Sequence, residues 1–517
     1  MRLRVGIDVG GTNTDAVVVD ESGKVLASVK TATTTDPFDG IRNALSSMVA
    51  EVDGGSIAQA MLGTTHPINA IIQRRGLEKV GVLRLAAPST LGARPGAGWP
   101  DDLVEAVLGH SEIIGGGHEY DGSEIAPLDE DAVRAFAAKV RDRVSAIAVS
   151  APFSPVNRDH ELRAAEILSE ELGADVPISM SHEVGAIGLI ERENAVILNA
   201  SLLGVAREVV HGFGRALAEQ GLDAEIYLTQ NDGTLMTAET ALNFPVLALG
   251  SGPTNSMRGA CRLAGLSDAV VVDVGGTSTD IGILIDGFPR ESTASEEIGG
   301  VRTNFRMPDL VSFGLGGGTI VRIEGDRTVV GPDSVGHRVV EDAIVCGGEV
   351  LTMSDVSVRA GRLRGFGDAS LVESLDSGIV VRAFEWGDAQ IKAITDRMKA
   401  SSALMPLIAV GGGSHLVPDT IEGVSEVIRP AHHEVANAYG AAIAEASGFV
   451  ERMYRYEDRS REECLAEARA LAIEEAVRAG ADPAQVRITS LSEIPLSYVP
   501  GNSNRVLVKA AGPLQVV

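Results

Sequence analysis

The sequence predicts an α/β protein built from two related halves, and three observations support this prediction. The chain has 517 residues, whereas a single domain usually holds about 150 residues. Apolar runs typical of strands alternate with runs of helical period along the chain. The stretch DVGGTNTD at residues 8–15 recurs as DVGGTSTD at residues 273–280, with seven of the eight positions identical.

The first elements are predicted from β-branched residues, turns and caps. Strands are predicted at residues 3–9, 16–20 and 24–30, joined by the short turns GGTNT and DESGK. A helix is expected from Asp36, as N-cap, to about residue 52, with Pro37 in its first turn. A strand at residues 79–87 follows. Residues 88–127 are rich in Gly and Pro and are expected to form an excursion on the surface.

The alternation continues through the rest of the chain. A strand is predicted at residues 145–153, a strand, turn and strand at residues 224–237, and a strand that ends in a glycine loop at residues 406–418. Helices are predicted at residues 157–173, 190–219, 432–446 and 461–480. SGPTNS at residues 251–256 is interpreted as a Gly-Pro turn before a helix that ends near Ala264. The last predicted helix is amphipathic and is closed by Gly480.

Composition excludes several classes of protein. The net charge of −27 argues against nucleic-acid partners, which need a basic surface, and against an anionic membrane surface. The three cysteines, Cys261, Cys346 and Cys464, form no CxxC pair, so neither a disulfide framework nor a cysteine metal site is indicated. No signal peptide and no apolar run of about 18 residues is recognised, so we expect no membrane association and a cytoplasmic location.

The repeated motif has the residue types of a site for a metal-bound polyphosphate. The pairs Gly10–Gly11 and Gly275–Gly276 allow tight turns and close approach of backbone N–H groups to an anion. Side-chain donors around these turns are Thr12, Asn13, Thr14, Thr277, Ser278 and Thr279. Asp8 and Asp273 would repel a bare triphosphate, so we expect Mg²⁺ held between these acids and the phosphates, with water as intermediary. A ligand-free hairpin would explain one copy, whereas two copies favour facing hairpins around one ligand.

The paired loops resemble the two phosphate loops of the actin, Hsp70 and sugar-kinase superfamily. The stretch AVGGGSHLVP at residues 409–418 resembles the adenosine loop of that superfamily, and NAYGAA at residues 437–442 resembles its second connecting helix. The resemblance implies two ribonuclease-H-like lobes around an ATP cleft, with inserted segments and a small C-terminal α+β tail. It also implies contacts with the base and ribose from Gly411, Gly412, Gly413 and Ser414.

Further stretches are similar to the hydantoinase A / 5-oxoprolinase family over essentially the whole chain. They are GTTHPINAIIQRRG (63–76), SHEVGAIGLIERENAVILNASL (181–202), TQNDGTLMTAETALNFPVLALGSGP (229–253), FGLGGGTI (313–320), GPDSVG (331–336) and the tail at residues 482–509. The similarity implies an N-terminal region at residues 1–180 with the first phosphate loop. It further implies a core at residues 181–447 with the second phosphate loop and the adenosine loop, and a C-terminal helix and strands at residues 448–517. Gly316 and Gly317 are expected beside the nucleotide.

The resemblance also implies a function. Family members use ATP to open a cyclic amide such as a hydantoin or 5-oxoproline, and related members carboxylate acetone or acetophenone. We therefore expect an ATP- and Mg²⁺-dependent hydrolase that phosphorylates the amide oxygen, or its ATP-handling subunit, acting with a separate β-type subunit in an oligomer. The alternatives are an ATP-dependent carboxylase subunit, a small-molecule kinase and an ATP-gated regulatory subunit. Asp8, Asp273, Thr12 and Thr277 are expected to act in phosphoryl transfer.

Candidate substrate residues lie outside the glycine loops. They are Thr65, His66, Asn69, His182, Glu183 and Asn231. The first three lie in a polar turn before a helix, where an anionic group would be favoured. His66 is expected either to bind substrate or metal or to be structural. For His182 and Glu183 a catalytic role is the expectation, and a capping role for Ser181 is the alternative. In GGGHEYDG at residues 115–122, His118, Glu119 and Asp121 indicate either a metal site or a solvated turn.

Overall fold

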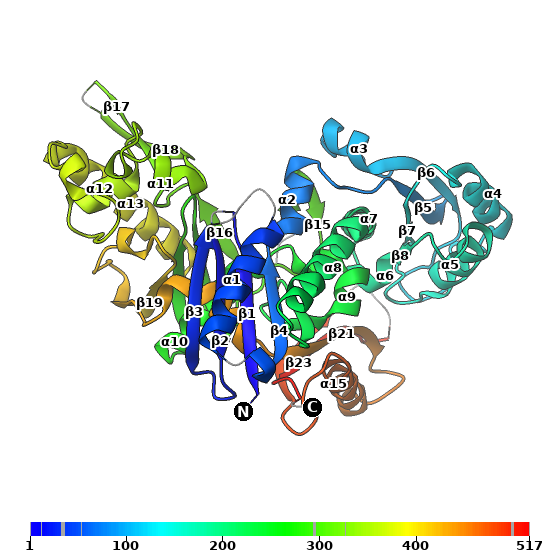
Figure 1. The fold of residues 1–517 in the computed structure, drawn as a ribbon. Helices are drawn as coiled ribbons and strands as arrows, with labels where there is room; N and C mark the ends of the chain where they lie inside the picture. The colour runs from blue at the N-terminus through cyan, green and yellow to red at the C-terminus, as the bar shows by residue number, and fades with distance from the viewer. Residues whose placement is uncertain are drawn as a thin grey trace.

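The computed structural model describes residues 2–11, 13–32, 37–52, 54–292, 296–325, 327–497 and 501–515. Two α/β lobes lie side by side, and a third α/β unit extends from the first lobe (Figure 1). The predicted α/β fold with two ribonuclease-H-like lobes, inserted segments and a C-terminal α+β tail is confirmed.

A mixed nine-stranded sheet forms the first lobe in the described part of the chain. In order across the sheet its strands are β22 (Arg487–Pro495), β23 (Ser503–Gly512), β21 (Ala446–Arg455), β10 (Leu235–Thr237), β9 (Glu225–Thr229), β4 (Ile57–Thr64), β1 (Leu3–Val9), β2 (Asn13–Val19) and β3 (Val25–Ala32). The C-terminal strands therefore extend the sheet that the N-terminal strands begin. Helix α15 (Arg461–Arg478) packs against β21 and β23.

Strand alternation gives β1 two different faces. Val5 and Ile7 are fully buried in the core formed with α1 (Pro37–Glu51) and α8 (Leu203–Glu219). Gly6 points to the other face, where α14 (Ala436–Ile443) packs. A Cβ atom at Gly6 would lie 2.2 Å from the carbonyl oxygen of Ala438, so only glycine allows this approach.

The second lobe repeats this plan around a six-stranded sheet of the described residues. Its strands are β13 (Phe288–Pro289), β12 (Thr279–Ile285), β11 (Ala269–Val274), β19 (Met405–Val410) and β20 (Val424–Ile428), with β16 (Leu310–Phe313) also paired to β12. Helix α13 (Ser377–Met398) covers one face, and α10 (Ser251–Ala264) covers the other. The predicted turn at residues 251–256 is wrong, because α10 begins at Ser251. Pro253 is tolerated because the first turn of a helix needs no intrahelical N–H donor.

Helices α10 and α14 form a common layer between the two sheets. Helix α10 packs on β11, β12 and β19, whereas α14 packs on β1, β2 and β4. The two helices approach closely at Gly259 and Gly440, where a Cβ atom would lie 1.9 Å from the carbonyl oxygens of Ala436 and Asn255, respectively. This contact brings the helix that packs on the first sheet against the helix that packs on the second.

The inserted unit has a four-stranded parallel sheet in the order β6–β5–β7–β8. Its elements are β5 (Val80–Ala87), β6 (Leu108–Gly115), α4 (Glu130–Val140), β7 (Ala146–Ser150), α5 (Asp159–Leu172) and β8 (Ile178–Met180). The predicted surface excursion at residues 88–127 is wrong in part, because it contains α3 (Asp101–Val107) and β6. Leu103 and Val107 are fully buried, and this apolar spacing outweighs the surrounding Gly and Pro residues.

The described residues form further α-helices and strands. They are α2 (His66–Gln73), α6 (Ser181–Val184), α7 (Leu189–Ser201), α9 (Ala238–Asn243), β14 (Glu296–Ile298), β15 (Val301–Thr303), β17 (Thr319–Glu324), β18 (Arg327–Ser334), α11 (Val339–Asp342) and α12 (Met353–Arg359). Within the described ranges, no single helix is long and apolar enough to cross a membrane. Helices α7 and α8 reach that length and apolarity only together, bent by 47° at their junction, and most of α7 is buried in the protein.

Candidate functional site

Each copy of the repeated motif forms a β-hairpin in which its two acids lie opposite each other. Asp8 of β1 pairs with Asp15 of β2, and Asp273 of β11 pairs with Asp280 of β12. In both lobes the first strand of the hairpin also pairs in parallel with a later strand, which is β4 in the first lobe and β19 in the second. The sequence repeat is therefore a repeat of local structure.

The two hairpin turns close with the same hydrogen bond. The N–H of Gly10 donates to the carbonyl of Asn13 at 3.0 Å, and the N–H of Gly275 donates to the carbonyl of Ser278 at 2.9 Å. A Cβ atom at Gly11 would meet nothing within 4 Å, so this side of the first turn is open. The first turn is thus accessible at Gly11, as a phosphate cradle requires.

The predicted phosphate-binding side chains divide into open and covered ones. Thr277 is exposed, whereas Gly276 and Ser278 are half-buried. Thr14 is fully buried on the opposite face of β2, where a Cβ atom at Gly40 of α1 would lie 2.4 Å from its hydroxyl oxygen. The structure therefore does not bring the Thr14 side chain to the face that carries the acids. Thr12 lies outside the described residues.

Asn437 of α14 joins the two acids of the first hairpin. Its amide nitrogen Nδ2 donates to Oδ2 of Asp8 at 3.0 Å and to Oδ2 of Asp15 at 2.8 Å. Both acids lie on the α14 face because they occupy cross-strand positions of the same hairpin. Asn437 belongs to the NAYGAA stretch, so the sequence pattern marked the helix but not this contact.

Two consecutive residues of α10 reach both hairpins. Nδ2 of Asn255 donates to Oδ1 of Asp8 at 3.4 Å, and the next residue, Ser256, is close enough to Asp273 to lower the pKa of that carboxyl. Because neighbouring residues of one helix lie beside acids of both lobes, the two hairpins converge near residues 255–256 of α10. This convergence is the arrangement that the sequence repeat predicted.

A glycine lies next to each of the two strand-end acids. Gly63 of β4 is opposite Asp8, and a Cβ atom there would lie 2.3 Å from Oδ1 of Asp8. Gly411 follows β19, and a Cβ atom there would lie 2.4 Å from Oδ1 of Asp273. Larger residues at either position would push the carboxylate away from its place.

Like charges and burial perturb these acids. Burial raises the pKa of Asp8 to about 6, and the negative charges of Asp15 and, to a smaller extent, Asp273 add to this rise. Hydrogen bonds from Asn255 and Asn437 lower the pKa and oppose the shift. Burial also raises the pKa of Asp273, against the hydrogen bond from Ser256 and the charge of Lys30. The charge of Asp273 thus acts on Asp8, and the charge of Asp15 helps to raise the pKa of Asp273, as expected for neighbouring hairpins.

These residues fit a divalent cation. Their carboxylate oxygens are the ligand type that Mg²⁺ prefers, and buried like charges would be neutralised by a cation. The clearance at Gly63 and Gly411 keeps both carboxylates in place. Within the described ranges no three His, Cys, Asp or Glu side chains cluster as metal ligands, so water and phosphate oxygens would complete the coordination. Asp8 and Asp273 are the residues that would hold the ion.

The glycine stretch FGLGGGTI supports the second hairpin. The N–H of Gly317 donates to the carbonyl of Gly275 at 3.1 Å, and a Cβ atom at Gly316 would lie 2.6 Å from the backbone nitrogen of Thr277. The predicted nucleotide-contacting residues Gly316 and Gly317 thus lie directly against the turn and fix its backbone.

The stretch GGGS lies at the same end of the second sheet. The N–H of Gly413 donates to the carbonyl of Val274 at 2.8 Å, which places the loop beside the first strand of the second hairpin. Gly413 and Ser414 are buried, whereas Gly412 is exposed. Gly412 is therefore the most accessible residue of the predicted adenosine loop.

Three predicted substrate residues lie beside the first hairpin. The N–H of Thr65 donates to the carbonyl of Val9 at 3.4 Å, and Nδ2 of Asn69 donates to the Thr65 hydroxyl at 3.3 Å. His66 begins α2 next to them. The fourth candidate, Asn231, has a structural role instead. Its side chain is buried, its Nδ2 donates to the carbonyl of Val246 at 3.0 Å, and its Oδ1 accepts from the N–H of Gly250 at 2.7 Å.

His182 and Glu183 lie on the inserted unit, at the end of β8. Glu161 of α5 accepts hydrogen bonds at 2.6 Å from both the Ser181 hydroxyl and Nδ1 of His182. Burial would raise the pKa of Glu161, but His182, Arg192 and Ser181 hold it below its ordinary value. Burial raises the pKa of Glu183. Sequence reasoning missed Glu161, since its partners are distant along the chain.

The GGGHEYDG stretch forms a turn. Oδ1 of Asp121 accepts hydrogen bonds from the backbone N–H and the hydroxyl of Ser123, and the His118 ring packs on the His160 ring with centroids 4.2 Å apart. These contacts agree with the prediction of a turn. Among the described residues, no three metal-binding side chains cluster in this stretch, as a metal site would need.

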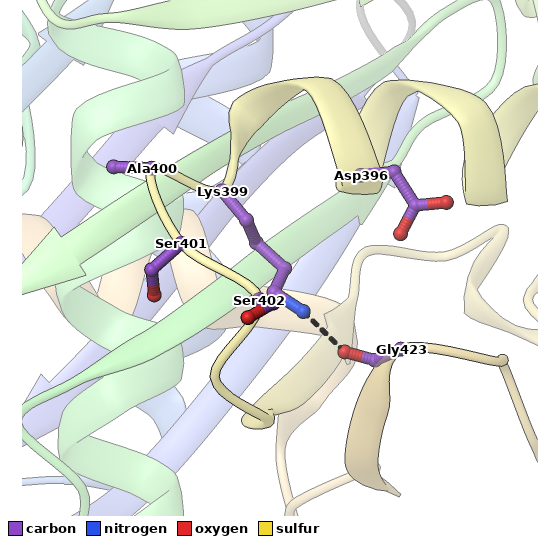
Figure 2. Close-up of a pocket in the computed structure, with 6 residues that line it drawn as sticks. All are labelled: Asp396, Lys399, Ala400, Ser401, Ser402 and Gly423. Atoms are coloured by element: carbon purple, nitrogen blue, oxygen red, sulfur yellow. Dashed lines mark hydrogen bonds between the residues drawn. The ribbon is translucent and has the colours of Figure 1, made fainter.

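A surface depression of about 430 Å³ lies at the other end of the second sheet. Figure 2 shows its lining, in which Nζ of Lys399 donates to the carbonyl of Gly423. It lies where β19 begins, whereas the GGGS loop follows the end of that strand. Six residues of strand span about 20 Å, so this depression is not part of the hairpin site.

The fold and the paired hairpins define the class of this protein. Two ribonuclease-H-like lobes joined by packed helices are the architecture of the actin, Hsp70 and sugar-kinase superfamily. The family described as "Hydantoinase/oxoprolinase N-terminal region" matches residues 4–172, and "Hydantoinase/oxoprolinase" matches residues 192–385. The chain belongs to the hydantoinase/oxoprolinase family.

Individual relatives agree with this assignment. Caprolactamase subunit alpha of Pseudomonas jessenii is 30% identical over 397 residues, covering 70% of this chain and 55% of that protein. Acetophenone carboxylase gamma subunit of Aromatoleum aromaticum is 29% identical over 395 residues, covering 69% and 53%. The crystal structure of ATP-dependent caprolactamase from Pseudomonas jessenii superposes with a TM-score of 0.77 at 21% identity, covering 99% of this chain and 88% of that chain, and shares its fold. The alignments span about half the length of these curated relatives.

Proposed function

We propose that this chain is an ATP-dependent enzyme that opens a cyclic amide, such as a hydantoin, 5-oxoproline or a related lactam, or is the ATP-handling subunit of such an enzyme. The observation that carries the proposal is the convergence of two DxGGT hairpins on Asn255 and Ser256 of α10. Similarity to a caprolactamase subunit supports the cyclic-amide substrate.

The proposed chemistry follows from the weakness of an amide as an electrophile. Transfer of the terminal phosphoryl group to the amide oxygen would make the carbonyl carbon open to attack by water. Such transfer depends on positioning and charge neutralisation more than on covalent catalysis by the protein. Mg²⁺, when bound, would neutralise phosphate charge.

The chain's own residues would divide this work. Backbone N–H groups of the two turns and the Thr277 hydroxyl would bind phosphate oxygens, and Asp8 and Asp273 would hold the cation. Thr65, His66 and Asn69 lie close enough to the first hairpin to contact the substrate. His182 has Nδ1 bonded to Glu161, an arrangement that leaves Nε2 to accept or donate a proton.

We further propose that a separate β-type subunit completes the reaction in a hetero-oligomer. Relatives named as subunits of caprolactamase and acetophenone carboxylase support a multi-subunit assembly. The second candidate is an ATP-dependent carboxylase subunit, which the acetophenone carboxylase relative supports. A small-molecule kinase and an ATP-gated regulatory subunit are further outcomes that the test below separates.

Product analysis tests the proposal. The purified chain, alone and with a co-expressed β-type subunit, is incubated with MgATP and hydantoin, 5-oxoproline or caprolactam. Ring-opened product formed in step with phosphate release supports the proposal. A stable phosphoester would identify a kinase, and turnover that needs bicarbonate and a ketone would identify a carboxylase. If ATP changes the conformation of the chain but no turnover occurs under any condition, the chain is an ATP-gated regulatory subunit.

A further inference from the structure

Lys30 of β3 lies at the hairpin site, although no sequence motif marked it. It is the cross-strand partner of Asp15, so both side chains lie on the same face of the sheet. Its ammonium nitrogen is 2.6 Å from Oδ1 of Asp15 and 3.0 Å from the carbonyl oxygen of Glu434, just before α14. The lysine thus joins a first-lobe hairpin to the segment that leads into the shared helix layer.

The Lys30 side chain also reaches the second lobe, beside the loop that carries Gly411, where a Cβ atom would lie 2.4 Å from Oδ1 of Asp273. A Cβ atom at Gly412, the exposed residue of the GGGS loop, would lie 3.9 Å from Cε of Lys30. Lys30 is therefore close to the acids of both hairpins and to the open part of the predicted adenosine loop.

Lys30 is the sole cation paired with the hairpin acids in the part of the chain that the structure describes. Asp15 forms an ion pair with Lys30, whereas Asp8 and Asp273 form none with any described Lys, Arg or His. About a third of the Lys30 side chain is exposed (32%), compared with 4% for Asp15. An ammonium group has three donors, and Asp15 and Glu434 account for two of them.

We propose that Lys30 is a phosphate-contacting residue, whose third N–H donates to a phosphate oxygen of the bound nucleoside polyphosphate. A compact ammonium suits phosphate as a point charge, and a charge-assisted hydrogen bond is about twice as strong as a neutral one. Asp15 and the Glu434 carbonyl hold the ammonium group in place. This inference rests on the proposed ATP-dependent function and names a residue that sets the preference for anionic nucleotides.

The test compares the affinities of the full chain and its variants for MgATP, MgADP and adenosine by calorimetry. Lys30→Met removes the charge at nearly constant volume, Lys30→Arg keeps it, and Lys24→Met is the matched control in the exposed turn before the same strand. We expect Lys30→Met to weaken MgATP and MgADP binding by roughly ten- to hundredfold and to leave adenosine unaffected. Lys30→Arg should recover most of the loss, and Lys24→Met should change nothing. Equal melting temperatures verify that the variants fold.

Several results would overturn the inference. Unchanged MgATP affinity in Lys30→Met would do so, and so would an equal loss for adenosine, since that would mean that Lys30 only supports the shape of the loop. If adenosine binds too weakly to measure, a Lys30→Arg variant as impaired as Lys30→Met would count against a role for the charge. A wild-type chain that binds neither MgATP nor MgADP would instead contradict the proposed function, and this inference with it.

Discussion

Asn255 and Ser256 are consecutive residues of α10: Nδ2 of Asn255 donates to Oδ1 of Asp8 at 3.4 Å, and Ser256 lies beside Asp273 and lowers its pKa. Asp8 and Asp273 are 265 residues apart in the sequence, yet both lie beside the same turn of α10. A helix that contacts both lobes ties the geometry of one hairpin to that of the other. The two acids should therefore behave as one functional unit.

The first prediction concerns the acids themselves. Asp8→Asn and Asp273→Asn should each lower ATP turnover by roughly a hundredfold or more, the scale on which one placed electrostatic group acts. The double variant should be little worse than either single variant, because residues that act as a unit are not additive. Steady-state phosphate release at saturating Mg²⁺ measures this. Asp223→Asn, an exposed residue of the first lobe, is the control. Wild-type turnover in both single variants would contradict the metal assignment.

The second prediction concerns the glycine opposite Asp8. Gly63→Ala should reduce ATP turnover by about tenfold or more, because a Cβ atom 2.3 Å from Oδ1 of Asp8 would force the carboxylate to move. Gly92→Ala is the matched control, since a Cβ atom there would meet nothing within 4 Å. Circular dichroism checks that both variants fold. Equal turnover in the two variants would show that the position of the Asp8 carboxylate does not matter.

The third prediction is a pH dependence of stability. The pKa of Asp8 is raised from 3.8 to about 6, so the folded chain binds this proton more tightly than the unfolded chain does. The stabilisation is therefore complete below about pH 4 and is lost as the pH rises through about 6. Without added metal or nucleotide, Asp8→Asn should show a smaller fall in urea midpoint between these pH values. Asp273 and Asp280, whose pKa values burial also raises, contribute to the dependence that remains. An identical fall in both proteins would contradict the assigned shift.

The fourth prediction concerns a buried ion pair that anchors the inserted unit. Nη2 of Arg84 in β5 lies 2.5 Å from Oε1 of Glu193 in α7, and both side chains are almost fully buried. Glu193→Ala should lower the free energy of unfolding by about 3–5 kcal/mol, because it leaves the buried Arg84 guanidinium without a counter-charge. The double variant Arg84→Met, Glu193→Leu should regain much of that loss. Urea unfolding measures both, and a single variant as stable as the wild type would refute this role for the pair.

Local patterns were enough to predict the hairpins and most of the elements. The DVGGT copies predicted two equivalent turns. In the structure β1 ends at Val9 and β11 at Val274, each one residue after the acid of its motif. Period-two alternation also explains why Thr14 was assigned wrongly to the ligand face, because it lies on the side of β2 opposite to Asp15. If that alternation had been applied to the motif, it would have placed Thr14 and Asp15 on opposite faces of the strand.

Contacts between distant segments could not be read from the sequence. Asn437, Gly63 and Lys30 reach the acids only through the packing of α14, β4 and β3 around β1 and β2. The pairing of Glu161 with His182 likewise depends on how α5 packs beside β8. These residues have no shared motif or fixed spacing, and only the three-dimensional fold brings them together.

The most direct test of the account is a crystal structure of the chain with a non-hydrolysable ATP analogue and Mn²⁺ in place of Mg²⁺. We predict one polyphosphate between the turns at residues 10–13 and 275–278, with anomalous signal from the ion between Asp8 and Asp273. An analogue bound elsewhere, or an ion that neither acid holds directly or through one water, would contradict the conclusion that both hairpins bind one nucleotide.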